Sequence, residues 1–224
     1  MKIVALLPMK ANSERVKGKN FRDLGGKPLF RWILDTLLSV PAISQVVINT
    51  DAREILERHA LTSTDRVLIR DRRPEICGDT VSMNLVLADD IQNVDADIFL
   101  MTHTTNPFLS VATLETALER YREGLQAGTA DSLFTVNKMQ TRFYRQDGSP
   151  VNHDPANLVR TQDLEPWFEE NSNLYVFSKA SFARTGARIG LRPILLEMSK
   201  AEAVDIDDQA DWQLAAAIAE QRRK

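Results

Sequence analysis

Short apolar segments alternate with segments of helical spacing along most of this chain, and this alternation restricts the folds that it can adopt. Strands are expected at residues 3–7, 45–49, 67–70, 98–101, 133–136 and 173–177. Helices are expected at residues 29–38, around 55–56, and at 82–92, 114–125 and 212–219. Strands that alternate with helices form a mainly parallel sheet covered on both faces, so we predict a three-layer, Rossmann-like α/β fold.

A polar segment at residues 138–170 interrupts the alternation. It contains Asp147-Gly148, which is a turn signal, and prolines at positions 150, 155 and 166. We interpret it as a hairpin and an excursion rather than as another strand and helix. The 224 residues otherwise fit one large domain, 1–224, that carries this excursion.

Charge is distributed unevenly, although the net charge is only −3. The small net charge argues against a broad nucleic-acid surface, so no nucleic-acid partner is expected. The segment 10–31 holds seven basic and two acidic residues, whereas the segment 205–211 holds four aspartates and no base. This segregation suits a nucleotide triphosphate at one place and a metal ion at another, and two solvated charged faces are the alternative.

The single cysteine, Cys77, excludes an internal disulfide and is compatible with a reducing cytoplasm. The first residues lead directly into the first predicted strand, without the apolar region and cleavage site of a secretory signal. No apolar run is long enough to cross a bilayer. We therefore expect a cytoplasmic protein with no membrane partner.

The loop after the first predicted strand is basic, with Lys10, Arg15, Lys17 and Lys19 against the single acid Glu14. A buried strand that opens into a cationic loop at its carboxyl end is typical of sites for phosphorylated ligands. The chain has neither a Walker loop nor a Gly-x-Gly-x-x-Gly fingerprint. Phosphates must therefore be held mostly by side chains, and Lys10, Arg15 and Lys19 supply that charge.

Asp205-Ile206-Asp207-Asp208 precedes the last predicted helix. If the segment is extended, Asp205 and Asp207 lie on one face and Ile206 points the other way into the core. Two adjacent carboxylates repel unless a cation lies between them, and hard oxygen ligands suit Mg²⁺. The alternative is that Asp207 or Asp208 only caps the helix, with Asp211 complementing the helix dipole.

These motifs resemble the signatures of the cytidylyltransferases that activate acidic sugars, above all the acylneuraminate branch. The residues in register are Pro8, Ser13, Arg15, Gly18, Lys19, Asn20, Gly26, Lys27, Pro28 and Leu29. Lys10 stands where that family usually has Arg, which keeps the charge but not the bidentate fork, and Glu14 stands where it has Lys. The Lys19-Asn20 pair favours the acylneuraminate branch over the branch that activates 3-deoxy-octulosonic acid (KDO). The resemblance implies a nucleotidyltransferase fold.

Residues 70–80 resemble the second motif of that family. An ungapped match places Arg72 on its nucleotide-binding arginine, while the Arg-Pro pair points to Arg73; we favour Arg72. The alternative is a loop whose arginines pair with Asp71 and Asp79.

The resemblance assigns roles to particular residues. The implied nucleotide-binding residues are Lys10, Asn12, Ser13, Arg15, Lys19, Asn20, Arg72 and Ser82. The implied catalytic residues are Lys10, Lys19, Asp205 and Asp207, and the two aspartates are the implied ligands of a Mg²⁺ cofactor. The implied acceptor-binding residues are His103, Thr105, Asn106, Arg160, Gln162 and Asn171.

The resemblance weakens at the acceptor pocket. His103 replaces a Gln of the family and Leu109 replaces an Arg. An Arg often found shortly before Asn171 is absent, and Glu169 and Glu170 stand there instead. A buried acid without a cationic partner is costly, so these changes leave open an acceptor other than sialic acid.

The expected function is transfer of CMP from CTP to an acidic, 2-keto acid sugar with release of pyrophosphate, by a homodimer whose excursion packs against the second subunit. The alternatives are CMP transfer to an atypical acceptor such as KDO or a phosphonate, or a nucleotide-binding paralogue without catalysis.

Overall fold

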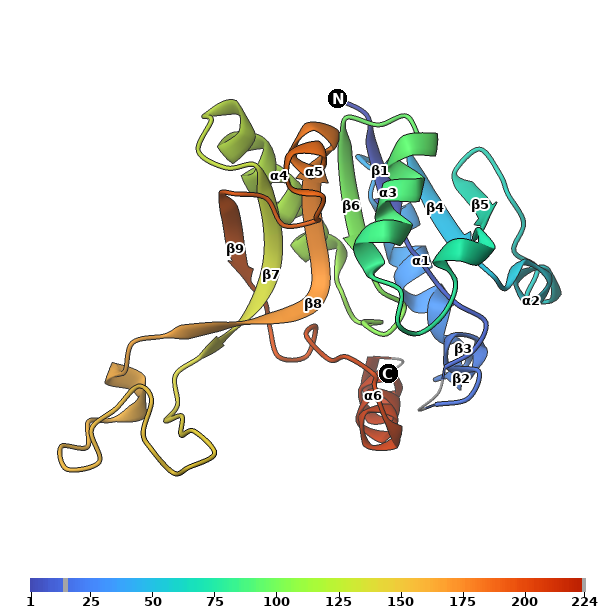
Figure 1. Cartoon of the computed structure of the whole chain (residues 1–224). Coiled ribbons are helices and arrows are strands. Elements are labelled where there is room, and N and C mark those ends of the chain that lie inside the picture. The colour runs from blue at the N-terminus through green and yellow to red at the C-terminus, as the bar shows by residue number, and fades with distance from the viewer. Residues whose placement is uncertain (14–15, 223–224) are drawn as a thin grey trace.

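The computed structural model describes residues 1–13 and 16–222, and it confirms the three-layer α/β fold (Figure 1). The strands of the main sheet are β1 (Ile3–Leu6), β4 (Gln45–Thr50), β5 (Val67–Asp71), β6 (Ile98–Thr102), β7 (Ser132–Met139), β8 (Trp167–Ser178) and β9 (Pro193–Glu197). A separate small pair is formed by β2 (Asp23–Leu24) and β3 (Lys27–Pro28). The α-helices are α1 (Leu29–Ser39), α2 (Arg53–Arg58), α3 (Met83–Asn93), α4 (Val111–Gln126), α5 (Lys179–Thr185) and α6 (Gln209–Arg222).

The main sheet has the strand order β5-β4-β1-β6-β8-β7-β9. The strands β5, β4, β1 and β6 are mutually parallel, and β8 runs antiparallel to both of its neighbours. The chain first moves outward from β1 to β4 and β5 and then returns to place β6 on the other side of β1. The carboxyl edge between β1 and β6 is therefore the point at which open α/β sheets bind ligands.

Side-chain alternation along β1 divides the core into two layers. Ile3 and Ala5 pack on one face with residues of α1 and α4, whereas Val4 and Leu6 pack on the other with residues of α3 and α5. All four are at most 1% exposed, as expected for a central strand buried on both faces.

A third cluster docks α6 on the β2–β3 pair. Trp212 and Ala219 of α6 pack with Leu24, Leu29 and Ile206. At the turn between the two short strands, Gly25 has a φ of +62°, and a Cβ there would lie 2.9 Å from the Cβ of Ala219. Glycine is thus required both by the left-handed backbone and by the close approach of α6.

The predicted elements exist, but the structure adds to them. Strand β8 runs from Trp167 and pairs with β7 as far as Met139, so the excursion proper spans 140–166 rather than 138–170. Its first four residues, 167–170, are all exposed and include two glutamates, so the pattern of a buried strand does not extend to them. The helix α5 and the edge strand β9 were not predicted, because one has seven residues and the other begins with a proline that only an edge strand tolerates.

The excursion extends from the ends of β7 and β8 away from the rest of the chain (Figure 1). Within the described residues, no helix combines the length and apolar character needed to cross a membrane.

Candidate active site

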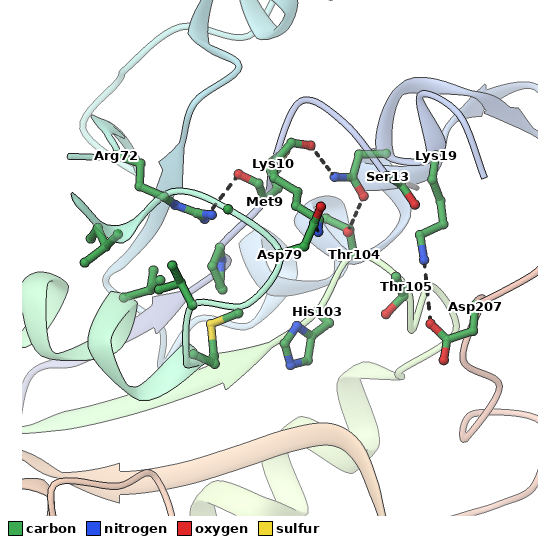
Figure 2. Close-up of a pocket in the computed structure, with 17 residues that line it drawn as sticks. Met9, Lys10, Ser13, Lys19, Arg72, Asp79, His103, Thr104, Thr105 and Asp207 are labelled. Atoms are coloured by element: carbon green, nitrogen blue, oxygen red, sulfur yellow. Dashed lines mark hydrogen bonds and ion pairs between the residues drawn. The ribbon is translucent and has the colours of Figure 1, made fainter. Parts of the chain in front are cut away.

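A pocket of about 360 Å³ lies at the carboxyl edge of β1 and β6, where the first and last motifs of the sequence meet (Figure 2). Eight of the predicted site residues line it: Lys10, Ser13, Lys19, Asn20, Arg72, His103, Thr105 and Asp207. The sequence argument did not select Asp79, Thr104 or the apolar residues Met83 and Val86, which also line it. Asp79 lies within residues 70–80, the segment that resembles the second motif of the family, so the sequence could have indicated it.

Asn20 fixes the cationic loop against the end of β6. Its Nδ2 donates to the carbonyl of Lys10 at 2.8 Å, and its Oδ1 accepts from the hydroxyl of Thr104 at 2.6 Å (Figure 2). Asn20 is 7% exposed and Thr104 is 4% exposed. Buried side-chain bonds of this kind hold a loop in one conformation, so the backbone beside Lys10 is positioned before any ligand binds.

Lys19 joins the loop to the aspartate segment. Its ammonium donates to the carbonyl of Ile206 and lies 3.9 Å from Oδ1 of Asp207 (Figure 2). Only 10% of its side chain is exposed. The charge is thus held at the wall of the pocket, where low water content strengthens its interaction with an anion.

The aspartate segment is not a strand, which corrects the prediction that strand alternation places Asp205 and Asp207 on one face. The N–H of Ile206 donates instead to the carbonyl of Thr105, at 2.9 Å, and the carbonyl of Ile206 accepts from Lys19. Ile206 is fully buried in the third cluster, as the alternation predicted. Asp207 lines the pocket and Asp205 lies behind it, next to Thr105.

Asp205 has the character of a metal ligand. Burial raises its pKa, as do the charges of Asp207 and Asp211, while a hydrogen bond from Thr105 and the charge of Lys19 oppose the rise. Its Oδ1 is buried and has no hydrogen-bond partner among the described residues. An unpaired buried carboxylate oxygen is costly, and a divalent cation would satisfy it. Asp205 and Asp207 therefore fit a Mg²⁺ ion.

The described residues contain no cluster of three or more His, Cys, Asp or Glu side chains. Two protein carboxylates are nevertheless enough for Mg²⁺, which usually keeps several waters and binds substrate phosphates.

Helix α6 is capped by the other two aspartates. Asp208 accepts from the N–H groups of Ala210 and Asp211, at 2.8 and 3.0 Å, and Asp211 accepts in return from those of Asp207 and Asp208, both at 2.9 Å. This reciprocal arrangement is a capping box. Asp208 rather than Asp207 thus caps the helix, and the backbone of Asp207 is fixed by the same contacts.

The geometry distinguishes Arg72 from Arg73. Arg72 lines the pocket, and its guanidinium donates to Oδ1 and the carbonyl of Asn49, at 2.9 and 2.8 Å, and to the carbonyl of Met9 at 3.3 Å. Burial lowers its pKa, but arginine stays charged. Arg73 pairs instead with Asp89 at 2.9 Å.

A buried ionic network lies behind Arg72. Arg70 pairs with Asp89 at 3.0 Å and also with Asp90, which accepts from Asn49 at 2.8 Å. Burial raises the pKa of Asp90 to about 6, although Asn49 and Arg70 oppose the rise. Because Asn49 bonds both Asp90 and Arg72, the network fixes the Arg72 guanidinium from behind.

Asp79 pairs with Lys10 across the mouth of the pocket (Figure 2). The Lys10 and Asp79 side chains are 41% and 46% exposed, so the pair is solvated and weak. The arginine pairings suggested for this loop are different in the structure, because Asp71 pairs with Arg53 at 2.6 Å.

His103 lies at the end of β6 and points into the pocket (Figure 2). Burial, followed by the charges of Arg188 and Lys19, lowers its pKa to about 3. The imidazole is therefore neutral near pH 7 and can donate or accept a hydrogen bond without adding charge.

Several other predicted residues that the structure describes do not line this pocket. Ser82 caps α3 by accepting from the N–H of Asn84 at 3.3 Å, and Asn12 is exposed. Asn106 is buried and donates to the carbonyl of Val204 at 3.3 Å. Arg15 lies outside the described residues.

Three predicted acceptor residues are on or near the excursion. Arg160 is exposed and pairs with Asp163 at 2.7 Å, and Gln162 is exposed beside it. Asn171 is buried in β8, where its side chain accepts from Thr135 at 2.7 Å and donates to Asn137 at 3.1 Å. Its bonds are therefore within the sheet.

Comparison with known proteins gives a consistent result. The sequence profile of the family described as "Cytidylyltransferase" matches residues 4–218. The chain is 29% identical to an N-acylneuraminate cytidylyltransferase of Oncorhynchus mykiss, over 95% of this chain and 49% of that protein. It is 26% identical to a CMP-N,N'-diacetyllegionaminic acid synthase of Legionella pneumophila, over 98% of this chain and 97% of that protein. The chain thus spans about half the length of the first relative and nearly all of the second.

A solved structure shares the fold. A CMP:2-keto-3-deoxy-manno-octonic acid synthetase complexed with CTP superposes with a TM-score of 0.71 and 16% sequence identity, covering 99% of this chain and 100% of that one.

Proposed function

This chain belongs to the cytidylyltransferase family, and from that membership and the pocket we propose that it transfers CMP from CTP to an acidic sugar. The relatives named above act on N-acylneuraminate or diacetyllegionaminic acid, and the structural neighbour was solved with CTP. The observation that carries the proposal is the contact between Lys19 and Ile206, which holds the cationic loop against the aspartate segment and so beside Asp207 in the pocket.

In this reaction a hydroxyl oxygen of the acceptor forms a bond to the α-phosphorus of CTP. The bond from that phosphorus to the bridging oxygen breaks, pyrophosphate leaves, and the hydroxyl proton passes to solvent. Transfers of this kind need positioned groups and charge neutralisation rather than covalent catalysis.

The cations of the pocket are suited to the triphosphate. Lys10 and Lys19 line it from the cationic loop, Arg72 lines it from the end of β5, and each carries a positive charge toward the same space. Lys19 and Arg72 are held by buried hydrogen bonds, so they need little reorganisation when negative charge develops.

Asp205 and Asp207 would hold Mg²⁺, whose chemistry is to offset phosphate charge and lower the pKa of a bound hydroxyl. His103 is unsuited as a general base, because its pKa of about 3 leaves it a weak one. It is suited instead to orient an acceptor hydroxyl by a hydrogen bond.

We also propose a homodimer in the cytoplasm. Support for the dimer comes from large apolar side chains that are exposed on the excursion and at the adjoining start of β8: Tyr144, Leu158, Val159, Trp167 and Phe168. Contiguous exposed apolar surface is typical of interaction sites. The unpaired thiol of Cys77 suits a reducing compartment.

The proposal is tested by CTP- and Mg²⁺-dependent release of pyrophosphate with a panel of sialic, legionaminic, pseudaminic and octulosonic acids. Release with one acceptor and recovery of its CMP derivative is the expected result. Release only with a phosphonate would support the atypical-acceptor alternative. CTP binding without release in any reaction would support a non-catalytic nucleotide-binding protein and overturn the proposal.

A further inference from the structure

A second polar cluster adjoins His103 on the face of the sheet that α3 and α5 cover. It consists of Glu170 and Tyr175 of β8 and Arg188 of the loop between α5 and β9. The Arg188 guanidinium lies 3.8 Å from the centroid of the Tyr175 ring and 3.5 Å from a Glu170 oxygen. The Tyr175 hydroxyl donates to the same oxygen of Glu170. None of these residues was assigned a role above.

The cluster is next to the pocket by strand register. Tyr175 pairs with Met101 across β6 and β8, so the two side chains share a face, and His103 lies two residues further along that face. Arg188 reaches the sulfur of Met101 at 3.8 Å. Its charge and that of Lys19 both lower the pKa of His103.

An irregularity in β8 brings Glu170 into this cluster. Phe134 of β7 pairs with Tyr175, but Val136 pairs with Glu170, so two steps along β7 correspond to five along β8. Ser172, within the irregular stretch, has a φ of +52°, a left-handed backbone that is unfavourable for a residue other than glycine. Bulges and local strain of this kind are concentrated at functional sites.

We propose that Arg188 binds the carboxylate of the acceptor and so determines that this protein uses an acidic sugar. This inference rests on the proposed function. Lys10, Lys19 and Arg72 surround the space suited to the triphosphate, and among the described residues Arg188 is a further cation whose charge acts on His103. An acceptor that contacts His103 and Thr105 can thus direct its hydroxyl toward Asp207 and its carboxylate toward Arg188.

The state of Arg188 in the structure fits this role. Guanidinium has five N–H donors, yet among the described residues its one oxygen partner is Glu170, at the 3.5 Å limit of a hydrogen bond. The side chain is 19% exposed, so it is accessible but largely desolvated. Stacking on Tyr175 holds the plane of the guanidinium, and a planar fork can bind a carboxylate through two parallel hydrogen bonds.

Glu170 has a corresponding role as the counterion of Arg188 when no acceptor is bound. It stands in the segment where the sequence comparison expected an arginine. This segment can carry glutamate in place of that arginine if Arg188, from the α5–β9 loop, supplies the positive charge.

The test is steady-state kinetics of Arg188→Gln and Arg188→Lys with the most active acid of the panel and with its methyl ester. With the acid, we expect Arg188→Gln to lower kcat/KM for the acceptor about 100-fold while KM for CTP stays unchanged. Arg188→Lys should recover only part of this loss, since the charge returns without the fork. With the ester, the wild-type protein and Arg188→Gln should be equally slow.

The matched control is Arg192→Gln, which alters a nearby arginine that donates to the carbonyl of Gly128 outside the pocket, and it should leave both constants unchanged. An equal loss for Arg188→Gln with acid and ester would mean that Arg188 only supports the fold, and it would overturn the inference. Unchanged kinetics of Arg188→Gln with the acid would also overturn the inference. In either case, activity of the wild-type protein would still support the proposed function. If the wild-type protein released no pyrophosphate with any acceptor, both the proposed function and the role of Arg188 would be overturned.

Discussion

Lys19 donates its ammonium hydrogen bond to the carbonyl of Ile206, a residue 187 positions further along the chain. Ile206 is the residue between Asp205 and Asp207, and its own side chain is buried in the cluster that docks α6. One contact thus fixes the position of the ammonium, of the aspartate segment and of the last helix relative to one another. The cationic loop and the aspartate segment are therefore positioned together before a substrate is present.

Replacement of Lys19 by methionine should lower kcat by about 100- to 1000-fold, since a preorganised positive charge close to the phosphates is lost. Methionine keeps most of the buried aliphatic volume, so the protein should remain folded. Steady-state kinetics and the far-UV circular dichroism spectrum check both statements. Lys17→Met is the control, because Lys17 lies in the same loop but is exposed. Equal activity of the two variants would show that Lys19 has no part in catalysis.

Replacement of Asp207 by alanine should reduce turnover by orders of magnitude and leave the fold intact, because its side chain is half exposed and the capping of α6 uses only its backbone. Calorimetric titration with Mg²⁺ in the presence of a non-hydrolysable CTP analogue should show a corresponding loss of metal binding. Asp35→Ala, at an exposed ion pair with Lys27, is the control. Near-normal activity of the Asp207 variant would refute the assignment of the metal site.

Replacement of Asp79 by asparagine should lower KM for CTP, by up to about fivefold, because a carboxylate that competes with the triphosphate for Lys10 is removed. The effect is small because exposed ion pairs contribute at most about 1 kcal/mol. The dependence on salt identifies the loss of the ion pair as the cause. The difference in KM for CTP between Asp79→Asn and the wild-type protein should become smaller as ionic strength increases. A higher KM would instead mean that Asp79 helps to bind the nucleotide.

His103 gives a pH dependence of stability with a defined sign. Its pKa is about 3 in the folded chain and about 6.5 when unfolded, so between these values the unfolded state binds a proton that the folded state does not. Stability contributed by the neutral imidazole is therefore lost as the pH falls from about 6.5 toward 3. Between pH 7 and pH 4, His103→Gln should therefore lose less stability than the wild-type protein, by about 3 kcal/mol.

Chemical denaturation of both proteins at several pH values measures this difference. In the same experiment Asp90 acts with the opposite sign. Its pKa is raised from 3.8 to about 6 in the folded protein, so the stability that its protonated form contributes is lost as the pH rises through these values. The two effects partly cancel in the wild-type protein, and only the substitution separates them. Identical pH profiles for wild type and His103→Gln would contradict the prediction.

The parts of the site that the sequence predicts best are those fixed by local order along the chain. Lys10, Lys19 and Asn20 follow a buried strand within a dozen residues, so their place at the carboxyl edge of the sheet follows from the strand itself. The sequence favours Arg72 over Arg73 by an ungapped match, against the Arg-Pro pair that points to Arg73. What the sequence does not show is the reason that Arg72 lines the pocket, because this depends on Asn49 of a neighbouring strand.

Long-range contacts were not predictable in the same way. Arg188 follows a seven-residue helix and belongs to no recognisable motif, and only the pairing of β6 with β8 brings its loop beside His103. The same is true of Asn171, whose sequence match suggested an acceptor residue but whose side chain holds the irregular part of β8. A match in sequence preserves the residue type, whereas its partners depend on the register of the sheet.

The excursion allows the predicted dimer to be tested through its active site. Phe168 is 46% exposed at the base of the excursion, and Phe168→Asp should convert a dimer of 25.3 kDa subunits into monomers. Charge at the centre of an apolar contact is strongly unfavourable. Sedimentation equilibrium measures the mass. Leu214→Asp, at a leucine of α6 that is 54% exposed outside the excursion, is the control and should leave the mass unchanged.

Complementation then asks whether the excursion completes the partner's pocket. Arg160 lies on the excursion, which extends away from the rest of its own chain, so we expect any acceptor contact that it makes to be with the other subunit of the proposed dimer (Figure 1). Arg160→Ala and Asp207→Ala should each be nearly inactive alone. When the two are unfolded, mixed in equal amounts and refolded, half of the dimers should be mixed, and each of these has one site without either substitution. Recovery of about a quarter of the wild-type activity is expected, and no recovery beyond the sum of the two variants would contradict a shared site.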